Sequence, residues 1–243
     1  METSTIVAHL EGDVKHHSRL TFAMQEEVSE ALKPGPPQQV LVEAFSIAVR
    51  RRDVATLREG QWLNDTVVNF YLALIAERSE KRGGPRVYAF STHFFTKLYR
   101  CGYEGVKRWT RGVDLFAYEI LLVPVNFADA SHWCLAVVDF RTHEMVIYDS
   151  LGPSEKHAES IDALAHYLQE ESHLRGRDLD WGGWRFYPRT VPLQKNASDC
   201  GVFICRYAEC LTRDAPILFK QRHIPYLRRR IVYEILHRRL LRW

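Results

Sequence analysis

Hydrophobic residues recur with helical spacing in several stretches of the chain. The clearest stripe lies in residues 65–80, a predicted helix that starts at Asp65, a favourable residue for a helix N-terminus. It consists of Val67, Val68, Phe70, Tyr71, Leu74 and Ile75. Weaker helical patterns cover residues 21–32, which a Pro/Gly-rich segment ends, and residues 155–173. Another helix is predicted to begin at Cys200 and to carry apolar residues on one side.

Strand patterns lie between these helices. Residues 132–140 and 144–150 are rich in β-branched and aromatic residues, and the polar segment 141–143 between them is short, which predicts a β-hairpin. Residues 121–125 are expected to form a buried strand just before it, and residues 178–189 a loop or edge strand. Helices and strands in one chain predict an α+β fold, with helices packed on a central, mostly antiparallel sheet.

Length and charge favour one ordinary globular domain. The 243 residues are 46% hydrophobic, enough for a complete core, and we expect one folded domain at 21–243 after a flexible lead-in at 1–20. A net charge of +3 gives no reason to expect a nucleic-acid partner. No apolar run approaches the ~20 residues needed to cross a bilayer, and no signal pattern opens the chain. We therefore expect a soluble, intracellular protein without a membrane partner.

Cys200 is the first candidate for chemistry. Ser198 and Asp199, just before it, are residue types that favour a helix N-cap. A thiol in the first turn faces the positive end of the helix dipole, which favours the thiolate nucleophile. The chain has five cysteines and no C-x-x-C pair, and Cys200, Cys205 and Cys210 point in different directions around one helix. Since these thiols cannot converge on one ion, we expect neither a metal nor a cofactor.

The predicted hairpin supplies a base for this thiol. Opposed residues of an antiparallel pair share a face and have a constant sum of residue numbers, so His132 and Asp149 can meet at one end of the hairpin. A carboxylate that holds an imidazole beside a thiol is the arrangement of an activated nucleophile. Gln194 and the backbone N–H of Cys200 are candidate oxyanion donors. Alternatively, Gln194 is simply a polar loop residue.

Five separated segments resemble one family, and they occur in its order along the chain. The segments are 62–65, 106–110, 132–139, 148–150 and 194–201, and residues 229–238 also fit. They resemble the SUMO-specific (sentrin-specific, Ulp-type) cysteine proteases, over roughly residue 20 to the end. The resemblance implies a papain-like, Ulp-type fold with the catalytic cysteine at a helix N-terminus.

The resemblance also implies roles for individual residues. His132, Asp149 and Cys200 match the catalytic triad of the family, and Gln194 matches its oxyanion-hole glutamine. Trp62 and Trp133 match the two tryptophans that cover the diglycine tail of the substrate. Three further residues, Asp65, Arg108 and Trp109, lie in blocks that match modifier-binding parts of the family. His93 and a longer connection at 126–131 depart from the family pattern and concern the choice of modifier.

The implied activity is that of a thiol isopeptidase. It would cut after the C-terminal Gly-Gly of SUMO, both releasing SUMO from target lysines and maturing its precursor. The implied partners are SUMO and SUMO-conjugated proteins, and we expect a monomer in the nucleus, with the cytoplasm as a second location. The alternatives are the same chemistry on another diglycine-terminated modifier such as ubiquitin, a viral-type thiol endopeptidase, and a catalytically silent modifier-binding module.

Two basic stretches carry weaker signals. Residues 222–243 contain seven arginines among apolar residues at helical spacing, which predicts a terminal amphipathic helix with a solvated basic face. Binding of nucleic acid or another acidic surface is the alternative for this helix. Arg50, Arg51 and Arg52 form a triplet that is a weak nuclear-targeting signal.

Overall fold

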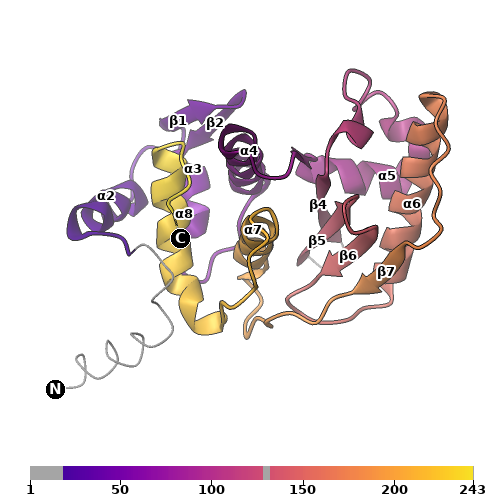
Figure 1. Ribbon diagram of the computed structural model, residues 1–243. Coiled ribbons are helices and arrows are strands. Elements are labelled where there is room, and N and C mark those ends of the chain that lie inside the picture. Colours follow the sequence, from indigo (N-terminus) through magenta and orange to yellow (C-terminus); the bar gives the residue numbers. More distant parts are fainter. Residues whose placement is uncertain (1–18, 128–131, 243) are drawn as a thin grey trace.

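The computed structural model describes residues 19–127 and 132–242, which include all of the predicted elements (Figure 1). Residues 1–18 of the lead-in predicted at 1–20, and residues 128–131 of the connection at 126–131, lie outside the described residues. The helices are α2 (Phe22–Leu32), α3 (Arg51–Val54), α4 (Asp65–Arg82), α5 (Thr92–Val106), α6 (Lys156–Leu174), α7 (Cys200–Leu211) and α8 (Ile224–Leu236). The strands are β1 (Val40–Ala44), β2 (Ile47–Arg50), β3 (Val87–Ala89), β4 (Ile120–Phe127), β5 (His132–Asp139), β6 (Glu144–Tyr148) and β7 (Arg185–Pro188). Short 3₁₀ turns lie at η1 (Ala55–Leu57), η2 (Leu115–Ala117) and η3 (Gln221–His223).

The main sheet has the strand order β3-β4-β5-β6-β7, and β1 and β2 form a separate hairpin. The three central strands are antiparallel, as predicted, whereas β3 joins β4 and β7 joins β6 in parallel. The α+β prediction is therefore confirmed, with a sheet that is antiparallel at its centre and parallel at both edges. The predicted hairpin is β5–β6, with Leu135 opposite Tyr148 and Asp139 opposite Glu144.

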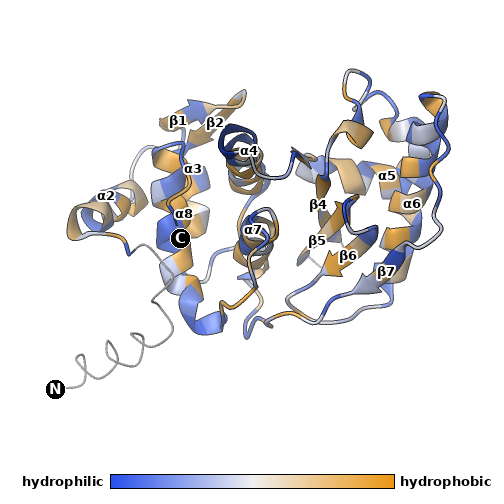
Figure 2. Ribbon diagram, viewed as in Figure 1, coloured by the Kyte–Doolittle hydropathy of each residue, from blue (hydrophilic) through white to orange (hydrophobic). Residues whose placement is uncertain are grey.

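Both faces of the sheet are buried, each in its own hydrophobic core. Trp133, Leu135 and Val137 of β5 belong to a core with α4, α7 and α8, and the alternate β5 residues belong to a core with α5 and α6. Two-sided burial explains why β5 is a continuous apolar run rather than an alternating one. Figure 2 shows hydrophobic residues concentrated on the central strands, with hydrophilic residues on the outer side of α4.

Helix α8 differs from its prediction in one respect. The helix exists and is amphipathic, but the expectation that its basic face is solvated is wrong for Arg228 and Arg230, which are buried. Arg230 pairs with Glu234 at 2.9 Å, and Arg228 pairs with Asp199 at 2.6 Å. A buried guanidinium is tolerated when a carboxylate and further acceptors replace its water, and sequence spacing alone does not show those acceptors.

Arg51 of the basic triplet is also part of the fold. Its guanidinium donates to the side chain of Gln39 and to the backbone carbonyls of Glu30, Ala31 and Lys33. These bonds tie the start of α3 to the end of α2. No helix in the described part of the chain is long and apolar enough to cross a membrane.

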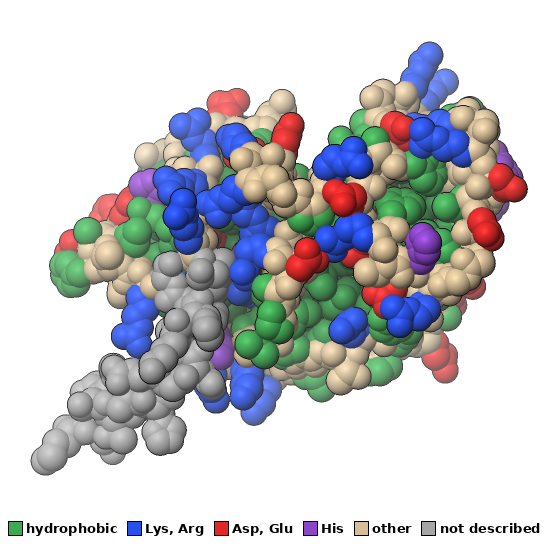
Figure 3. Space-filling model, in the orientation of Figure 1, with side chains coloured by type: hydrophobic (Ala, Val, Ile, Leu, Met, Phe, Trp, Pro, Cys, Tyr) green, Lys and Arg blue, Asp and Glu red, His purple; other side chains and the backbone are tan. Residues whose placement is uncertain are grey.

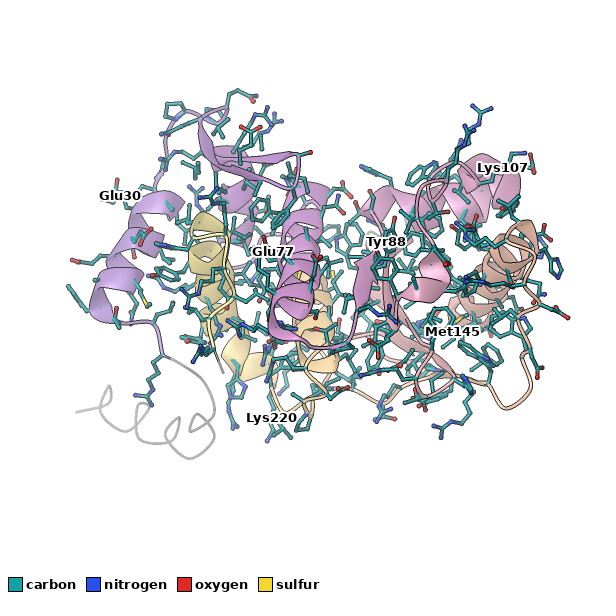
Figure 4. The ribbon with its side chains drawn as sticks, turned by 45° about the horizontal axis from the view of Figure 1, so that its top comes forward. Glu30, Glu77, Tyr88, Lys107, Met145 and Lys220 are labelled. Atoms are coloured by element: carbon teal, nitrogen blue, oxygen red, sulfur yellow. The ribbon has the colours of Figure 1, made fainter. Side chains whose placement is uncertain are left out.

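The part of the molecule that contains α4 and the β1–β2 hairpin meets the part that contains the main sheet and α5 at a hollow, which is visible in the space-filling view (Figure 3). A cavity of about 930 Å³ lies between α4 and β3 and includes Glu77 and Tyr88 in its lining (Figure 4). None of the residues predicted to carry chemistry lines it. The candidate site lies instead where the N-terminus of α7 approaches the start of β5.

Candidate active site

Cys200 is the first residue of α7, as predicted, and its side chain is buried against the sheet. Asp199 occupies the N-cap position, but its carboxylate bonds no helix N–H; it accepts from Arg228, Asn196 and Gln221. The backbone carbonyl of Asp199 takes the N–H groups of residues 202 and 203. Among the described residues, the backbone N–H of Cys200 has no acceptor, so it is available to a ligand beside the thiol.

His132 and Asp149 meet at one end of the hairpin, as predicted. They are not directly opposed, because Leu135 pairs with Tyr148, so the same register would place Asp149 opposite Cys134. His132 opens β5 and Asp149 follows the last residue of β6. The imidazole Nε2 lies 2.6 Å from Oδ1 of Asp149, and both side chains are buried. Because Nε2 is engaged by the carboxylate, Nδ1 is the ring nitrogen left to face Cys200.

The surroundings of His132 favour its protonated form. Burial opposes the charge, but the bond to Asp149 and the interaction with the nearby Cys200 side chain outweigh it and raise the pKa of His132 to about 9. The ordinary pKa of histidine is 6.5. The imidazole can therefore hold a proton next to the thiol at neutral pH, ready to be donated.

Asp149 receives more hydrogen bonds than the sequence indicated. Its Oδ1 also accepts the backbone N–H of Leu151 at 2.7 Å, and its Oδ2 accepts from Nε2 of His157 at 2.9 Å and from Sγ of Cys134 at 3.1 Å. Burial would raise the pKa of Asp149, yet the bonds from His132, His157 and Leu151 hold it below its usual range. Asp149 thus remains a carboxylate although it is buried.

His157 and Cys134 are the residues that sequence reasoning missed. His157 lies in the first turn of α6, and its Nδ1 accepts the backbone N–H of Ser154 at 3.2 Å. The hydrogen-bond network therefore assigns the proton to Nε2, which donates to Asp149. Burial and the Asp149 carboxylate raise the pKa of the Cys134 thiol, which keeps it a donor. Strand alternation places Cys134 on the face of His132, but no sequence signal connects His157 to Asp149.

Gln194 is buried close to this group and has a fixed orientation. Its Oε1 accepts the hydroxyl of Ser150 at 2.6 Å, its backbone N–H bonds the carbonyl of Ser150 at 2.8 Å, and its Nε2 donates to the carbonyl of Asn196 at 2.5 Å. An amide nitrogen has two N–H groups, so one remains for a ligand. This arrangement fits an oxyanion donor better than a free polar loop residue.

Within residues 19–127 and 132–242, one group of side chains offers atoms that could ligate a metal. Ligand atoms of His132, Cys134 and Asp149 lie within 4.8 Å of one another. These atoms are already joined by the His132–Asp149 and Cys134–Asp149 hydrogen bonds. A metal ion would have to displace both bonds, so the arrangement suits proton transfer rather than metal binding.

The residues predicted to bind substrate are mostly gathered in one cavity. Trp62, Asp65, Trp109 and Trp133 all line a cavity of about 790 Å³, whereas Arg108 is exposed and does not line it. His93, one of the departures from the family pattern, lines the same cavity. Trp133 is only 6% exposed and Trp62 is 46% exposed. The indole N–H of Trp133 donates to the carbonyl of Leu63 at 3.3 Å. The two indoles therefore line the same cavity from different segments: Trp133 belongs to β5, and Trp62 to the segment before α4.

Gly201 is required by the close approach of that segment to α7. A Cβ at Gly201 would lie 2.7 Å from Cβ of Leu63, which is closer than carbon atoms can pack. The residue next to the thiol therefore touches the residue next to Trp62. Cys200 and Trp62 are held near each other by this contact.

We predict that Gly201→Ala destabilises the protein by about 1–3 kcal/mol, the usual range for overpacking a core. Without the clash, alanine would stabilise a helix by about 0.5–1 kcal/mol relative to glycine, so the sign of the change is informative. Urea unfolding measures it. Gly112→Ala is the control, because a Cβ there meets nothing within 4 Å. A Gly201→Ala protein as stable as the wild type would contradict the close packing.

We predict that His132 titrates with a midpoint of about 9, measured by NMR of its ring nitrogens. Since the folded pKa lies above the ordinary 6.5, the bound proton stabilises the fold fully below pH 6.5, and this contribution is lost as the pH rises through 9. Asp149→Asn should lower the midpoint, because burial then acts without the carboxylate. A wild-type midpoint at or below 6.5 would refute the assignment.

Comparison with known proteins places the chain in a family. Residues 61–240 match the Ulp1 protease family, C-terminal catalytic domain. Sentrin-specific protease 2 of Mus musculus is 45% identical over 225 residues, 91% of this chain and 38% of that protein. A sentrin-specific protease of Caenorhabditis elegans is 42% identical over 217 residues, 88% of this chain and 31% of that protein. The chain thus spans less than two fifths of these curated relatives.

A solved structure shows the same architecture. The C-terminal Ulp1 protease domain in complex with Smt3, the yeast orthologue of SUMO, superposes with a TM-score of 0.80 at 29% identity and covers 90% of this chain and 96% of that one. The Ulp-type fold predicted from the sequence is therefore confirmed. By its family match, its relatives and its fold, the chain belongs to the Ulp1 protease family.

Proposed function

We propose that the protein is a thiol isopeptidase that cleaves after the C-terminal Gly-Gly of SUMO, both from target lysines and from the SUMO precursor. The observation that carries this proposal is the buried His132–Asp149 pair beside Cys200, at the edge of a cavity lined by Trp62 and Trp133. The likeness to sentrin-specific proteases and to a Ulp1 domain bound to Smt3 supports the choice of modifier. We propose that it acts as a monomer on SUMO and SUMO-conjugated proteins.

The first half of the reaction forms a thioester. The Cys200 thiolate attacks the carbonyl carbon of the last glycine, and the carbonyl oxygen becomes an oxyanion. The backbone N–H of Cys200 and the free N–H of Gln194 are the donors available to that oxyanion; one such donor typically contributes about 10²–10³ in rate. The C–N bond then breaks, and His132 gives its proton to the departing amine.

The second half regenerates the enzyme. His132, now neutral, takes a proton from a water molecule, and the resulting hydroxide adds to the thioester carbonyl. The C–S bond breaks, and the modifier leaves with a C-terminal carboxylic acid, which loses its proton to water and becomes a carboxylate. The thiolate and the protonated imidazole are restored. Asp149 holds the ring throughout, and its bonds from His157, Cys134 and Leu151 keep it ionised and oriented.

The two tryptophans explain selection for glycine. A diglycine tail has no side chains to recognise, so a site selects it by excluding every Cβ. A narrow space between the indole of Trp133, fixed by its bond to Leu63, and the indole of Trp62 can do this and can also exclude water from the scissile bond. Asp65 and Trp109 line the same cavity, and exposed Arg108 lies next to Trp109; we propose that these residues contact the body of the modifier.

The decisive test uses modifiers that carry a C-terminal electrophile. We expect a covalent adduct with SUMO, visible as a gel shift, and no adduct with ubiquitin. Cys200→Ser should form no adduct and still bind SUMO, since serine in this position lacks a thiolate. An adduct with another modifier alone would retain the chemistry and overturn the specificity. A folded wild-type protein that binds SUMO but reacts with no electrophile would favour a silent binding module.

We further propose that the protein acts in the nucleus, with the cytoplasm as a second location. Family resemblance supports this placement, and the basic triplet adds little because Arg51 is used inside the fold. The test is imaging of the protein fused to a tag too large to diffuse through nuclear pores. We expect nuclear enrichment that survives replacement of Arg50 and Arg52 by glutamine. Exclusion of the fusion from the nucleus would refute this location.

A further inference from the structure

Arg228 of α8 lies behind the candidate active site and bonds two separate segments of the chain. Its side chain is 2% exposed. On one side, its Nε and Nη2 donate to Oδ1 of Asp199 at 3.0 and 2.6 Å, and Nη2 also bonds the carbonyl of Ser198 at 3.0 Å. These two acceptors immediately precede Cys200.

The other side of the same guanidinium faces the segment before Trp62. Its Nη2 donates to the carbonyl of Gln61 at 2.8 Å, and its Nη1 donates to the carbonyls of Arg58 and Thr56 at 3.0 and 3.3 Å. A guanidinium has five N–H donors in a rigid plane. Here that single plane joins the turn that carries the nucleophile to the turn that carries one wall of the substrate cavity.

Side-chain packing brings the same two segments together. Leu63 leaves no room for a Cβ on Gly201, and the carbonyl of Leu63 accepts the indole N–H of Trp133. The Cys200 turn, the Trp62 segment and the start of β5 therefore meet around Leu63. Leu63 supplies the contact between them, and Arg228 supplies directional bonds that fix their relative position.

We propose that Arg228 is a positioning residue that sets the distance between the Cys200 thiol and the Trp62 wall of the substrate cavity. It touches neither the reacting atoms nor the cavity, and it acts through the backbone at 198–199 and 56–61. The structural link stands by itself, while its effect on cleavage rests on the proposed function. In the proposed reaction a diglycine tail lies between the Cys200 thiol and the Trp62 wall, so a change in the separation of the two segments would shift the scissile carbonyl away from the thiol.

Lysine at this position makes an informative variant. Arg228→Lys keeps the positive charge next to Asp199, so the buried carboxylate retains a partner. A single ammonium group cannot reproduce the flat, two-sided set of donors, and it loses one side of the link. The variant therefore removes the connection between the segments and keeps the buried charge compensated.

The same helix offers a matched control. Arg230 is equally buried, forms a buried ion pair with Glu234, and also donates to the carbonyl of Leu241. None of these acceptors belongs to the candidate site. Arg230→Lys therefore reproduces the loss of a buried guanidinium without touching the Cys200 turn or the Trp62 segment.

Hydrogen–deuterium exchange tests the link without any substrate. In Arg228→Lys we expect the amides of residues 56–63, 196–201 or both to exchange faster by about tenfold, the effect of losing a charge-assisted hydrogen bond. In Arg230→Lys both segments should keep wild-type rates. If Arg228→Lys fails to fold, Asp199→Asn gives a second test: residues 196–201 should exchange faster, while 56–63 keep their bonds to Arg228.

Two reagents then separate positioning from general damage. The reaction of Arg228→Lys with SUMO carrying a C-terminal electrophile should slow by about 10–100-fold at saturation, the usual effect of a misplacement near 1 Å. Its half-saturating SUMO concentration should change little. Iodoacetamide, which needs no alignment of a tail, should alkylate Cys200 at nearly the wild-type rate.

Each outcome has a definite meaning. Unchanged exchange in both segments of Arg228→Lys overturns the proposal, and so do equal losses in Arg228→Lys and Arg230→Lys, which would make Arg228 a source of stability only. If the wild type does not react with the SUMO electrophile but the exchange result holds, the proposed function fails and the link remains. Loss of iodoacetamide reactivity in parallel with SUMO reactivity would show damage at Cys200 itself and reject the positioning role.

Discussion

The chemistry of this protein depends on a buried carboxylate that remains charged. Asp149 can do so because four donors converge on its two oxygens: His132, His157, Cys134 and the N–H of Leu151. A carboxylate buried without such partners would take up a proton and cease to hold the imidazole. His132 and Cys134 belong to β5, and His157 belongs to the first turn of α6. The site therefore requires the sheet and α6, which packs on the sheet face opposite to α7, to be in place together.

The sequence predicted much of this architecture because the relevant signals are local. Helices α4, α6 and α7 and the β5–β6 hairpin follow from apolar spacing, and the meeting of His132 with Asp149 follows from strand alternation. Residues 178–189, predicted as a loop or edge strand, do contain the edge strand β7, but β3 and the parallel pairing of both edge strands could not be predicted in the same way. Their partners are set by crossovers that leave no local pattern in such short strands.

The residues that could not be predicted act through polar contacts between distant segments. His157 reaches Asp149 from a helix, and Arg228 reaches Asp199 and the carbonyls of 56–61 from the end of the chain. A buried arginine has the same spacing in a sequence as one that extends into water. Only the position of its acceptors distinguishes them, and Asp199 was interpreted as a helix cap although its carboxylate serves Arg228 instead.

The two walls of the tryptophan-lined cavity are unequal. The Trp133 indole is packed into the core and its N–H is bonded, whereas nearly half of the Trp62 side chain is in water. In the proposed reaction, enclosing a diglycine tail would therefore restrict mainly the Trp62 side chain, which has two rotatable bonds. In the proposed reaction, Trp133 would form a fixed wall of the cavity and Trp62 a mobile one, so release of a cleaved tail would require only the Trp62 indole to move.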